Sequence, residues 1–433
     1  MTPGARLAAA IDLLTETAAT RAPTAAVLER YFRARRYAGS GDRRAIAERV
    51  YGLLRRHARL GWWLDRGRLP DTPRARVLAD LVLGDGLDPA AAAAPFGAGP
   101  HAPAALDDAE AAFAAAVAGQ PLDHGDMPDP VRLEYPAWLD ASLRRAFGDG
   151  LDDEMAAANR PAPLDLRVNV LKTNRDGARK AFARDGVEVA VTPLSPRGLR
   201  LDPPRRVEDG RAYKGGLVEV QDEGSQIVAL LADARPGLTV VDYCAGAGGK
   251  TLAMAAEMQG RGRLIACDTD AARLDRLRER QKCAGPHNVE RVALDADGTA
   301  RLLRKVAADR VLVDAPCSGS GTWRRDPAAR WRLDPAALDD LLARQRTILA
   351  RAAGLVAPGG RLVYATCSVL PEENADQVAR FVSEHDRFSV LPVTELWQNP
   401  LDGTCPCAGP FLELTPARHG TDGFFAAILA RNS

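Results

Sequence analysis

Val241-Asp242-Tyr243-Cys244-Ala245-Gly246-Ala247-Gly248-Gly249-Lys250-Thr251 is the stretch that decides the fold of this chain. It joins a short apolar run, typical of a buried strand, to a helical segment at 252–259. The apolar runs that predict strands lie at residues 238–243, 263–267, 290–294, 310–314 and 361–366. Strands that alternate with helices through short turns predict an α/β fold with a parallel, doubly wound sheet, and residues 423–429 suit its last strand.

The glycines of this stretch predict a loop whose backbone turns tightly and approaches a ligand closely. A phosphate-binding loop would need glycine at position 244, which is cysteine, and a dinucleotide fingerprint would need it at 251, which is threonine. The remaining pattern, Asp-x-x-x-Gly-x-Gly-Gly, resembles the loop of S-adenosyl-L-methionine-dependent methyltransferases. The resemblance implies that this cofactor contacts Cys244, Ala245, Gly246, Ala247, Gly248, Gly249 and Lys250.

Aspartates at the ends of the later strands have distinct expected roles in such a site. Asp268 follows the second strand, where a carboxylate can accept hydrogen bonds from both ribose hydroxyls. Asp295 is expected at the adenine amino group, and Asp314 is expected to face the reacting centre. A single strand-end aspartate more often caps a helix. Together with Asp242, four at successive strand ends favour a shared cofactor site.

Two cysteines follow strands in the same way. Cys317 comes three residues after Asp314, and Cys367 comes directly after Thr366. Ligands and catalytic groups gather where parallel strands end, and a thiolate is a strong nucleophile. Either cysteine alone is better interpreted as a small buried apolar residue. Two in matched positions, beside a cofactor-type loop, predict covalent chemistry.

The motifs Asp314-Ala-Pro-Cys317-Ser and Ala365-Thr-Cys367-Ser resemble the paired motifs of the RNA cytosine-5 methyltransferase family (RsmB/NSUN type), and most of all its bacterial 16S ribosomal RNA members. Residues 167–172 and 419–425 are similar to two further motifs of that family, and the similarity covers about residues 135–433. The resemblance implies a Rossmann-like catalytic domain with a mostly parallel seven-stranded sheet, S-adenosyl-L-methionine as cofactor and RNA as substrate.

The resemblance also implies a role for each residue. Carbon 5 of cytosine is too weak a nucleophile to take a methyl group unless a thiolate first adds to C6. Carried over, Cys367 attacks, Cys317 helps release the product, Asp314 serves N3 and Lys250 orients the base. Related DNA methyltransferases attack from the Pro-Cys position, so Thr366-Cys367 favours RNA. Two alternatives stay open, namely tRNA as the substrate and a catalytically silent RNA-binding ribosome assembly factor.

Three regions are expected along the chain. Residues 1–130 have helical periodicity followed by an Ala/Pro-rich linker, and Ala45–Arg56 with Leu60–Leu64 resembles a shortened NusB-like RNA-binding domain. Residues 131–232 are expected to form a small α/β RNA-binding subdomain, and residues 233–433 the catalytic domain. Residues 323–332, which carry two tryptophans and four arginines directly after the Cys317 loop, are expected to contact RNA.

The composition narrows the class of protein. A formal net charge of +1 does not indicate a globally basic nucleic-acid binder. Residues 1–76 nevertheless carry 16 arginines against 7 acidic residues, which fits either a phosphate-binding surface or a solvated helical face. Seven scattered cysteines, no secretory signal and no apolar run of about 18 residues predict a cytoplasmic protein with free thiols and no membrane span. We expect no bound metal and a monomer.

Overall fold

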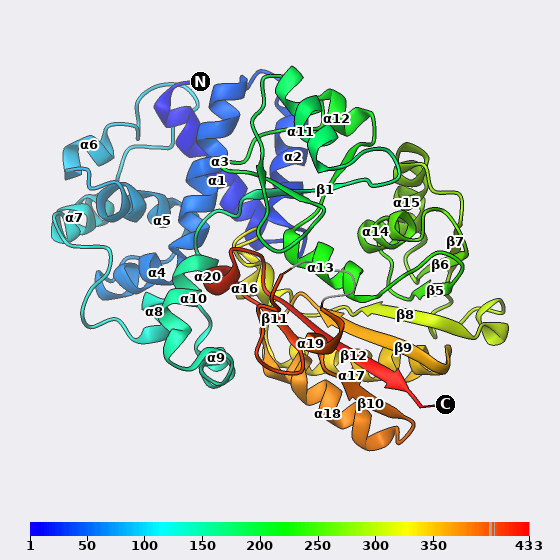
Figure 1. Cartoon of the computed structure of the whole chain (residues 1–433). Helices are drawn as coiled ribbons and strands as arrows, with labels where there is room; N and C mark the ends of the chain where they lie inside the picture. The colour runs from blue at the N-terminus through cyan, green and yellow to red at the C-terminus, as the bar shows by residue number, and fades with distance from the viewer. Residues whose placement is uncertain (398–400, 402, 433) are drawn as a thin grey trace. The chain divides into compact units, whose positions relative to one another are not determined.

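The computed structural model describes residues 1–397, 401 and 403–432, which fall into two compact units. The helical unit comprises residues 1–159 and 323–334, and the α/β unit comprises the remaining described residues (Figure 1). Within the described ranges, no helix is both long and apolar enough to cross a membrane. The boundaries expected near residues 130 and 232 stay predictions.

The α/β unit is built on one large sheet with the strand order β10-β12-β9-β8-β5-β6-β7, and β11 pairs with β12. From β9 to β7 the neighbours are parallel, whereas β12 is antiparallel to β9, β10 and β11. The strands are β5 (Thr239–Asp242), β6 (Arg263–Asp268), β7 (Val289–Ala293), β8 (Ala308–Asp314), β9 (Val356–Thr366), β10 (Phe388–Leu391), β11 (Leu412–Leu414) and β12 (Phe424–Arg431). All five strands expected around the parallel sheet are therefore present, and the last strand is antiparallel.

Helices cover both faces of this sheet (Figure 1). They are α13 (Glu223–Leu231), α14 (Gly249–Glu257), α15 (Ala271–Ala284), α17 (Pro335–Ala353) and α18 (Ala375–Glu384). Successive strand residues point to opposite faces. Leu312 accordingly joins the core that contains residues of α13 and α14, whereas Val311 and Val313 join the core that contains residues of α17 and α18. Burial on both faces explains why these strands are continuous apolar runs.

A smaller antiparallel sheet precedes the large one in the same unit. Its order is β2-β3-β1-β4, from β1 (Leu164–Val168), β2 (Ala190–Val191), β3 (Gly198–Leu201) and β4 (Val218–Val220). The helices beside it are α11 (Arg175–Arg184) and α12 (Arg211–Lys214). Leu166, Leu199 and Val218 pack with Phe182 of α11 in a core of their own. The mixture of strands and helices expected in this region is therefore present.

An apolar core of the helical unit extends further along the chain than expected. Its helices are α1 (Pro3–Ala18), α2 (Thr24–Ala34), α3 (Ser40–Arg55), α4 (His57–Arg66), α5 (Pro73–Ala79), α6 (Pro89–Ala93), α7 (Asp108–Val117), α8 (Asp129–Arg132), α9 (Asp140–Phe147), α10 (Leu151–Ala158) and α16 (Ala329–Arg332). Phe96, Phe113 and Val117, from the segment expected to be mostly linker, are buried in that core. A capping box between Asp107 and Glu110 starts α7.

The RNA contact expected for residues 323–332 is wrong for Trp323 and Arg330, which are both buried. Trp323 is 1% exposed and Arg330 is completely buried. Nη1 of Arg330 donates to the carbonyl of Glu134 at 2.6 Å, and its guanidinium lies 5.1 Å from the centre of the Trp323 ring. Side chains without exposed surface cannot stack on bases, so they stabilise the helical unit.

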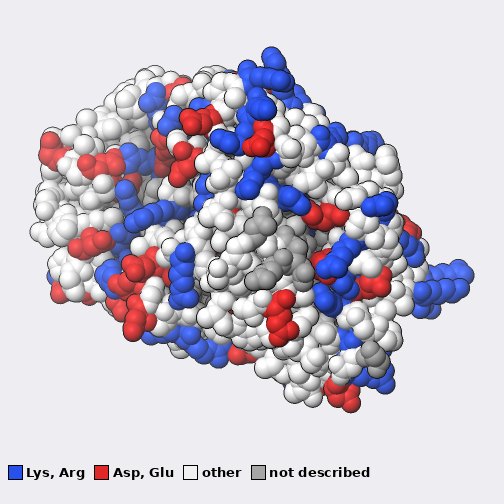
Figure 2. Space-filling model, in the orientation of Figure 1, with Lys and Arg blue, Asp and Glu red and all other residues white. Residues whose placement is uncertain are grey.

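The arginines of residues 1–76 are extensively paired with carboxylates. Arg49 and Arg56 both contact Asp80, Arg59 contacts Glu134, and Arg74 contacts Glu110. These acidic partners all come from residues after position 76. Ion pairs in the folded protein therefore compensate the excess of arginine over acidic residues in the first 76 residues. Basic and acidic side chains are interspersed over the face drawn in Figure 2.

Candidate active site

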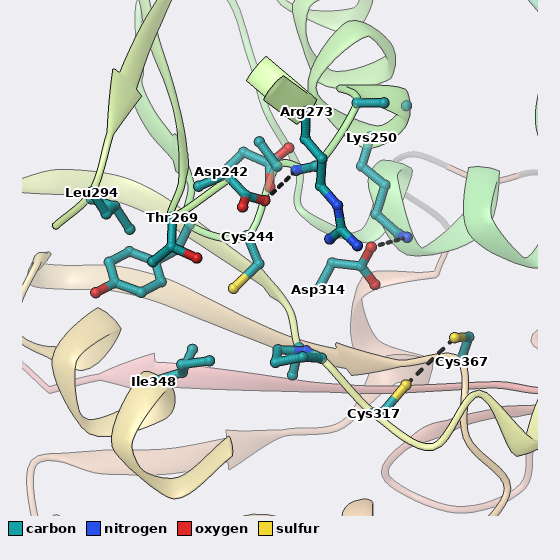
Figure 3. A pocket seen from close by; sticks show the side chains of 18 of the residues that line it. Asp242, Cys244, Lys250, Thr269, Arg273, Leu294, Asp314, Cys317, Ile348 and Cys367 are labelled. Carbon is teal, nitrogen blue, oxygen red and sulfur yellow. Dashed lines mark hydrogen bonds and ion pairs between the residues drawn. The ribbon is translucent and has the colours of Figure 1, made fainter. Parts of the chain in front are cut away.

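The carboxyl ends of β5, β6, β8 and β9 open onto a cavity of about 1110 Å³. The residues expected at the site that line it are Cys244, Ala245, Gly246, Ala247, Gly249, Lys250, Asp268, Asp314, Cys317 and Cys367. Side chains from separate strand ends surround the same space (Figure 3). The volume exceeds the range of about 300–1000 Å³ usual for a single small ligand, so the cavity has room for more than a cofactor.

The glycine loop adopts conformations that its glycines make possible. Gly246 and Gly248 have φ angles of +55° and +83°, in the left-handed region. A Cβ atom on Gly248 would lie 2.1 Å from Cδ1 of Leu277, so only glycine fits against α15 at this position. Gly248 faces that helix and does not line the cavity. The amide of Gly246 donates to Oδ2 of Asp268 at 2.8 Å, which joins the loop to the end of β6.

Two arginines support the loop from behind. Nη1 of Arg167 donates to the carbonyl of Gly249 at 2.5 Å and to Oε1 of Gln221, and burial lowers the pKa of Arg167 to about 10. Nη1 of Arg280 donates to the carbonyl of Ala247 at 2.7 Å. The sequence marked Arg167 only as part of a motif and did not mark Arg280. A basic residue on α15 carries no signal that it will reach a loop carbonyl.

Asp242 is a buried carboxylate with one oxygen in use. Oδ2 accepts from the hydroxyl of Thr251 at 2.6 Å, whereas Oδ1 is buried without a hydrogen-bond partner. Burial raises the pKa of Asp242 to about 7. Because Asp242 lines the cavity, the unpaired oxygen is suited to a cationic or hydrogen-bond-donating ligand group.

Lys250 and Asp314 form an ion pair beside the thiols, with Nζ and Oδ2 2.6 Å apart (Figure 3). Burial lowers the pKa of Lys250, but Asp314, followed by Cys367, more than offsets this effect and leaves the pKa above its ordinary value. Lys250 is therefore a cation whose charge reaches both Asp314 and Cys367.

The two predicted cysteines meet, with their sulfur atoms 3.4 Å apart (Figure 3). Both are free thiols and both line the cavity. The hydrogen bond with Cys367, together with burial, raises the pKa of Cys317 well above its ordinary value. The site thus pairs one thiol that retains its proton with a second thiol beside a lysine cation.

Asp295, expected at the adenine amino group, lies outside the residues that line the cavity. Its two carboxylate oxygens accept instead from the amide and the hydroxyl of Thr299, both at 2.7 Å. Asp297 lines the cavity instead, next to Gly298 and Leu294. A second aspartate two positions on was the only sequence signal for this alternative.

Comparisons with known proteins agree with this geometry. The family described as 16S rRNA methyltransferase RsmB/F matches residues 229–430, and the ferredoxin-like domain of RsmF/B-like methyltransferases matches residues 135–208. A probable ribosomal RNA small subunit methyltransferase B of Synechocystis is 33% identical over 302 residues, 69% of this chain and 67% of that protein. The ribosomal RNA small subunit methyltransferase B of Erwinia tasmaniensis is 33% identical over 320 residues, 72% and 69% of the two chains.

Solved structures extend the similarity to the fold. The crystal structure of PH0851 aligns with a TM-score of 0.76 and 26% identity, covering 99% of each chain. A methyltransferase homolog protein from Pyrococcus horikoshii aligns with a TM-score of 0.60 and 26% identity, covering 70% of this chain and 97% of that one. The predicted Rossmann-like fold and the family resemblance inferred from the cysteine motifs are confirmed. The chain belongs to the RsmB/F family of 16S rRNA methyltransferases.

Proposed function

We propose that this protein transfers a methyl group from S-adenosyl-L-methionine to carbon 5 of a cytosine in small-subunit ribosomal RNA. The observation that carries the proposal is the pair of thiols 3.4 Å apart, beside the Lys250–Asp314 ion pair in the cavity that the glycine loop also lines. A direct methyl transfer to oxygen or nitrogen would need no thiol, whereas C5 of cytosine needs a covalent activator.

The cavity residues fit the cofactor. Oδ1 of Asp242 is an unused acceptor for its ammonium group. Asp268 and Asp297 line the cavity and supply carboxylates for its ribose hydroxyls and its adenine amino group. Beside Gly246, the position of a Cβ atom has open space within 4 Å, which lets a ligand approach the backbone. When bound, S-adenosyl-L-methionine supplies an electrophilic methyl group on a sulfonium.

The chain's own residues account for the remaining chemistry. The thiol of Cys367 passes its proton to water, and the resulting thiolate, within electrostatic reach of the Lys250 cation, forms a bond to C6 of the cytosine. Asp314, held by Lys250, shares a proton with N3 as the ring becomes enamine-like and C5 becomes nucleophilic. After methylation, water takes the C5 proton, the electron pair of the C5–H bond restores the C5–C6 double bond, and the Cys367 sulfur leaves C6 as a thiolate. Cys317, in contact with Cys367, assists this release.

RNA recognition follows from the same geometry. The target base must leave its stack, or lie in a single-stranded loop, before C6 can reach a sulfur inside the cavity. The free state of all seven cysteines supports a reducing compartment such as the cytoplasm. A monomeric enzyme that works without a metal ion remains part of the proposal.

Covalent trapping tests the assignment of the two thiols. With small-subunit ribosomal RNA and cofactor, Cys317→Ala should accumulate an enzyme–RNA adduct that survives a denaturing gel, because methylation proceeds but release fails. Cys367→Ala should form no adduct and lose at least about 10³-fold in rate, as expected for a missing nucleophile.

Cys283→Ala is the matched control, because this thiol is free and does not line the cavity, so the variant should behave as wild type. The reverse trapping pattern would exchange the roles of the two cysteines. Methyl transfer to tRNA but not to ribosomal RNA would support the alternative substrate, and no transfer to any RNA would support a silent assembly factor.

A further inference from the structure

Glu373 is a fully buried acid that the reaction outlined above does not use. It ends a short helical turn, η6 (Pro371–Glu373), six residues after Cys367. Its relative exposure is 0%, and within the described residues no lysine or arginine contacts its carboxylate. Burying a carboxylate without a cationic partner destabilises the folded state unless hydrogen bonds replace the water that it loses.

Those hydrogen bonds reach the loop that carries the other thiol. Oε1 of Glu373 accepts from the amide of Ser318 at 2.8 Å, and Oε2 accepts from the hydroxyl of Ser318 at 2.5 Å. Ser318 directly follows Cys317. A single carboxylate therefore connects the turn after Cys367 to the loop of Cys317. These two segments carry the sulfur atoms that lie 3.4 Å apart.

The carboxylate is itself held in place. Nε2 of Gln345, in α17, donates to Oε1 of Glu373 at 2.9 Å and to the carbonyl of Pro316 at 3.0 Å. The hydroxyl of Tyr364 donates to the backbone carbonyl of Glu373 at 2.6 Å. Contacts from α17, β9 and the Cys317 loop thus fix Glu373 from three directions, as a positioning role requires.

We propose that Glu373 is a positioning residue for the two-thiol centre, which holds the Cys317 loop against Cys367 and keeps a buried carboxylate next to that loop. The inference rests on the proposed roles of the two cysteines. It makes the site asymmetric, with a buried anion beside Cys317 and the Lys250 cation within electrostatic reach of Cys367. The thiol that should attack is thereby distinguished from the thiol that should assist release.

Electrostatics agrees with the geometry. The hydrogen bond with Cys367 and burial are the main causes that raise the pKa of Cys317, and the charges of Cys367 and Glu373 add to them. Removing the charge of Glu373 should therefore lower the pKa of Cys317. The sign is fixed because a nearby anion disfavours the thiolate.

Glu373→Gln separates charge from hydrogen bonding. The amide oxygen can replace Oε1 and accept from Ser318 and Gln345, while the amide nitrogen donates to the Ser318 hydroxyl. That hydroxyl can turn its own proton toward Ser320 or Ser368, whose hydroxyl oxygens lie 3.1 and 3.3 Å away. Glu373→Ala removes both the charge and the bonds. Glu384→Gln, on the exposed side of α18, is the control for loss of a carboxylate elsewhere.

The experiment measures iodoacetamide alkylation of each cysteine against pH in the full chain, by peptide mass spectrometry. It needs neither RNA nor cofactor, so its result is independent of the trapping experiment. In Glu373→Gln, the alkylation midpoint of Cys317 should move to lower pH, whereas Glu384→Gln should match wild type. An unchanged Cys317 midpoint in Glu373→Gln would overturn the proposed electrostatic role.

Methylation kinetics test the positioning role. Glu373→Ala should reduce kcat by about 100-fold with little change in the KM for cofactor, which is the size of effect that a misplacement near 1 Å produces. Glu373→Gln should recover much of that loss. Full activity of Glu373→Ala, or equal losses in both variants, would overturn the proposal. If Glu373→Ala fails to fold, the alkylation profile of Glu373→Gln still decides.

Discussion

At the scale of single residues, we expect Asp242 to make the affinity for the cofactor depend on pH. Burial raises its pKa to about 7 in the free protein, and only its ionised form can pair with an ammonium group. Affinity for S-adenosyl-L-homocysteine, which keeps that ammonium group, should rise with pH through about 7 and be up to about tenfold weaker at pH 6 than at pH 8. Calorimetric titration at the two pH values measures the difference.

Asp242→Asn provides the control, because an amide keeps a partner for Thr251 but does not titrate. Its affinity should be weaker than that of wild type at pH 8 and nearly independent of pH. Equal wild-type affinity at both pH values would mean that the cofactor does not engage the unpaired oxygen of Asp242.

The aspartate suited to the adenine amino group could not be predicted from the sequence. A strand-end aspartate predicts the correct edge of the sheet, but not which of two nearby carboxylates faces the ligand. Asp295 is used by its own turn through Thr299, and this leaves Asp297 on the cavity wall. Turn hydrogen bonds depend on backbone angles that the sequence does not specify.

At the scale of elements, α17 forms one wall of the cavity, although nothing in the sequence singled it out. Arg344, Thr347 and Arg351 line the cavity at a spacing of three to four residues, which places them on one face of the helix. Arg344 is exposed, and no ion pair with a carboxylate is found for it among the described residues. A guanidinium at the rim of a site for RNA is suited to a phosphate.

Arg344→Ala should therefore weaken RNA binding and reduce the slope of log affinity against log salt by about 1, since one phosphate contact is lost. Cofactor affinity should not change. Arg346→Ala is the matched control on the same helix, because Arg346 does not line the cavity and donates to the carbonyl of Leu342. An identical salt slope for wild type and Arg344→Ala would exclude this contact.

The elements differ in how far the sequence could predict them. The parallel strands were predictable because burial on both faces makes each one a continuous apolar run. The thiol pair was predictable because each cysteine follows such a strand. The burial of the segment containing α7 was not predictable, because alanine contributes little periodicity and the packing of Phe113 and Val117 depends on distant helices. The contacts of Glu373 were not predictable either, since its bonds to Ser318 connect residues 55 positions apart.

At the scale of the whole molecule, the chain crosses between its two units within the catalytic sequence. It leaves the α/β unit after Thr322, contributes residues 323–334 to the helical unit, and returns at Pro335. The helical unit therefore contains a segment that begins six residues after Cys317. Its stability should depend on that segment as much as on the N-terminal helices.

Arg330 allows a direct test of this dependence. Its guanidinium is completely buried and donates to the carbonyls of Glu134 and Ala158 at 2.6 and 3.4 Å. Arg330→Met leaves both carbonyls without this donor, so it should lower the free energy of unfolding of the helical unit by about 2–5 kcal/mol. Hydrogen exchange should quicken in residues 1–159 and 323–334, while cofactor affinity is retained. Arg36→Ala, at an exposed arginine of the same unit, should change neither. Unchanged exchange in Arg330→Met, with a selective loss of RNA binding, would instead restore the RNA contact first expected for this segment.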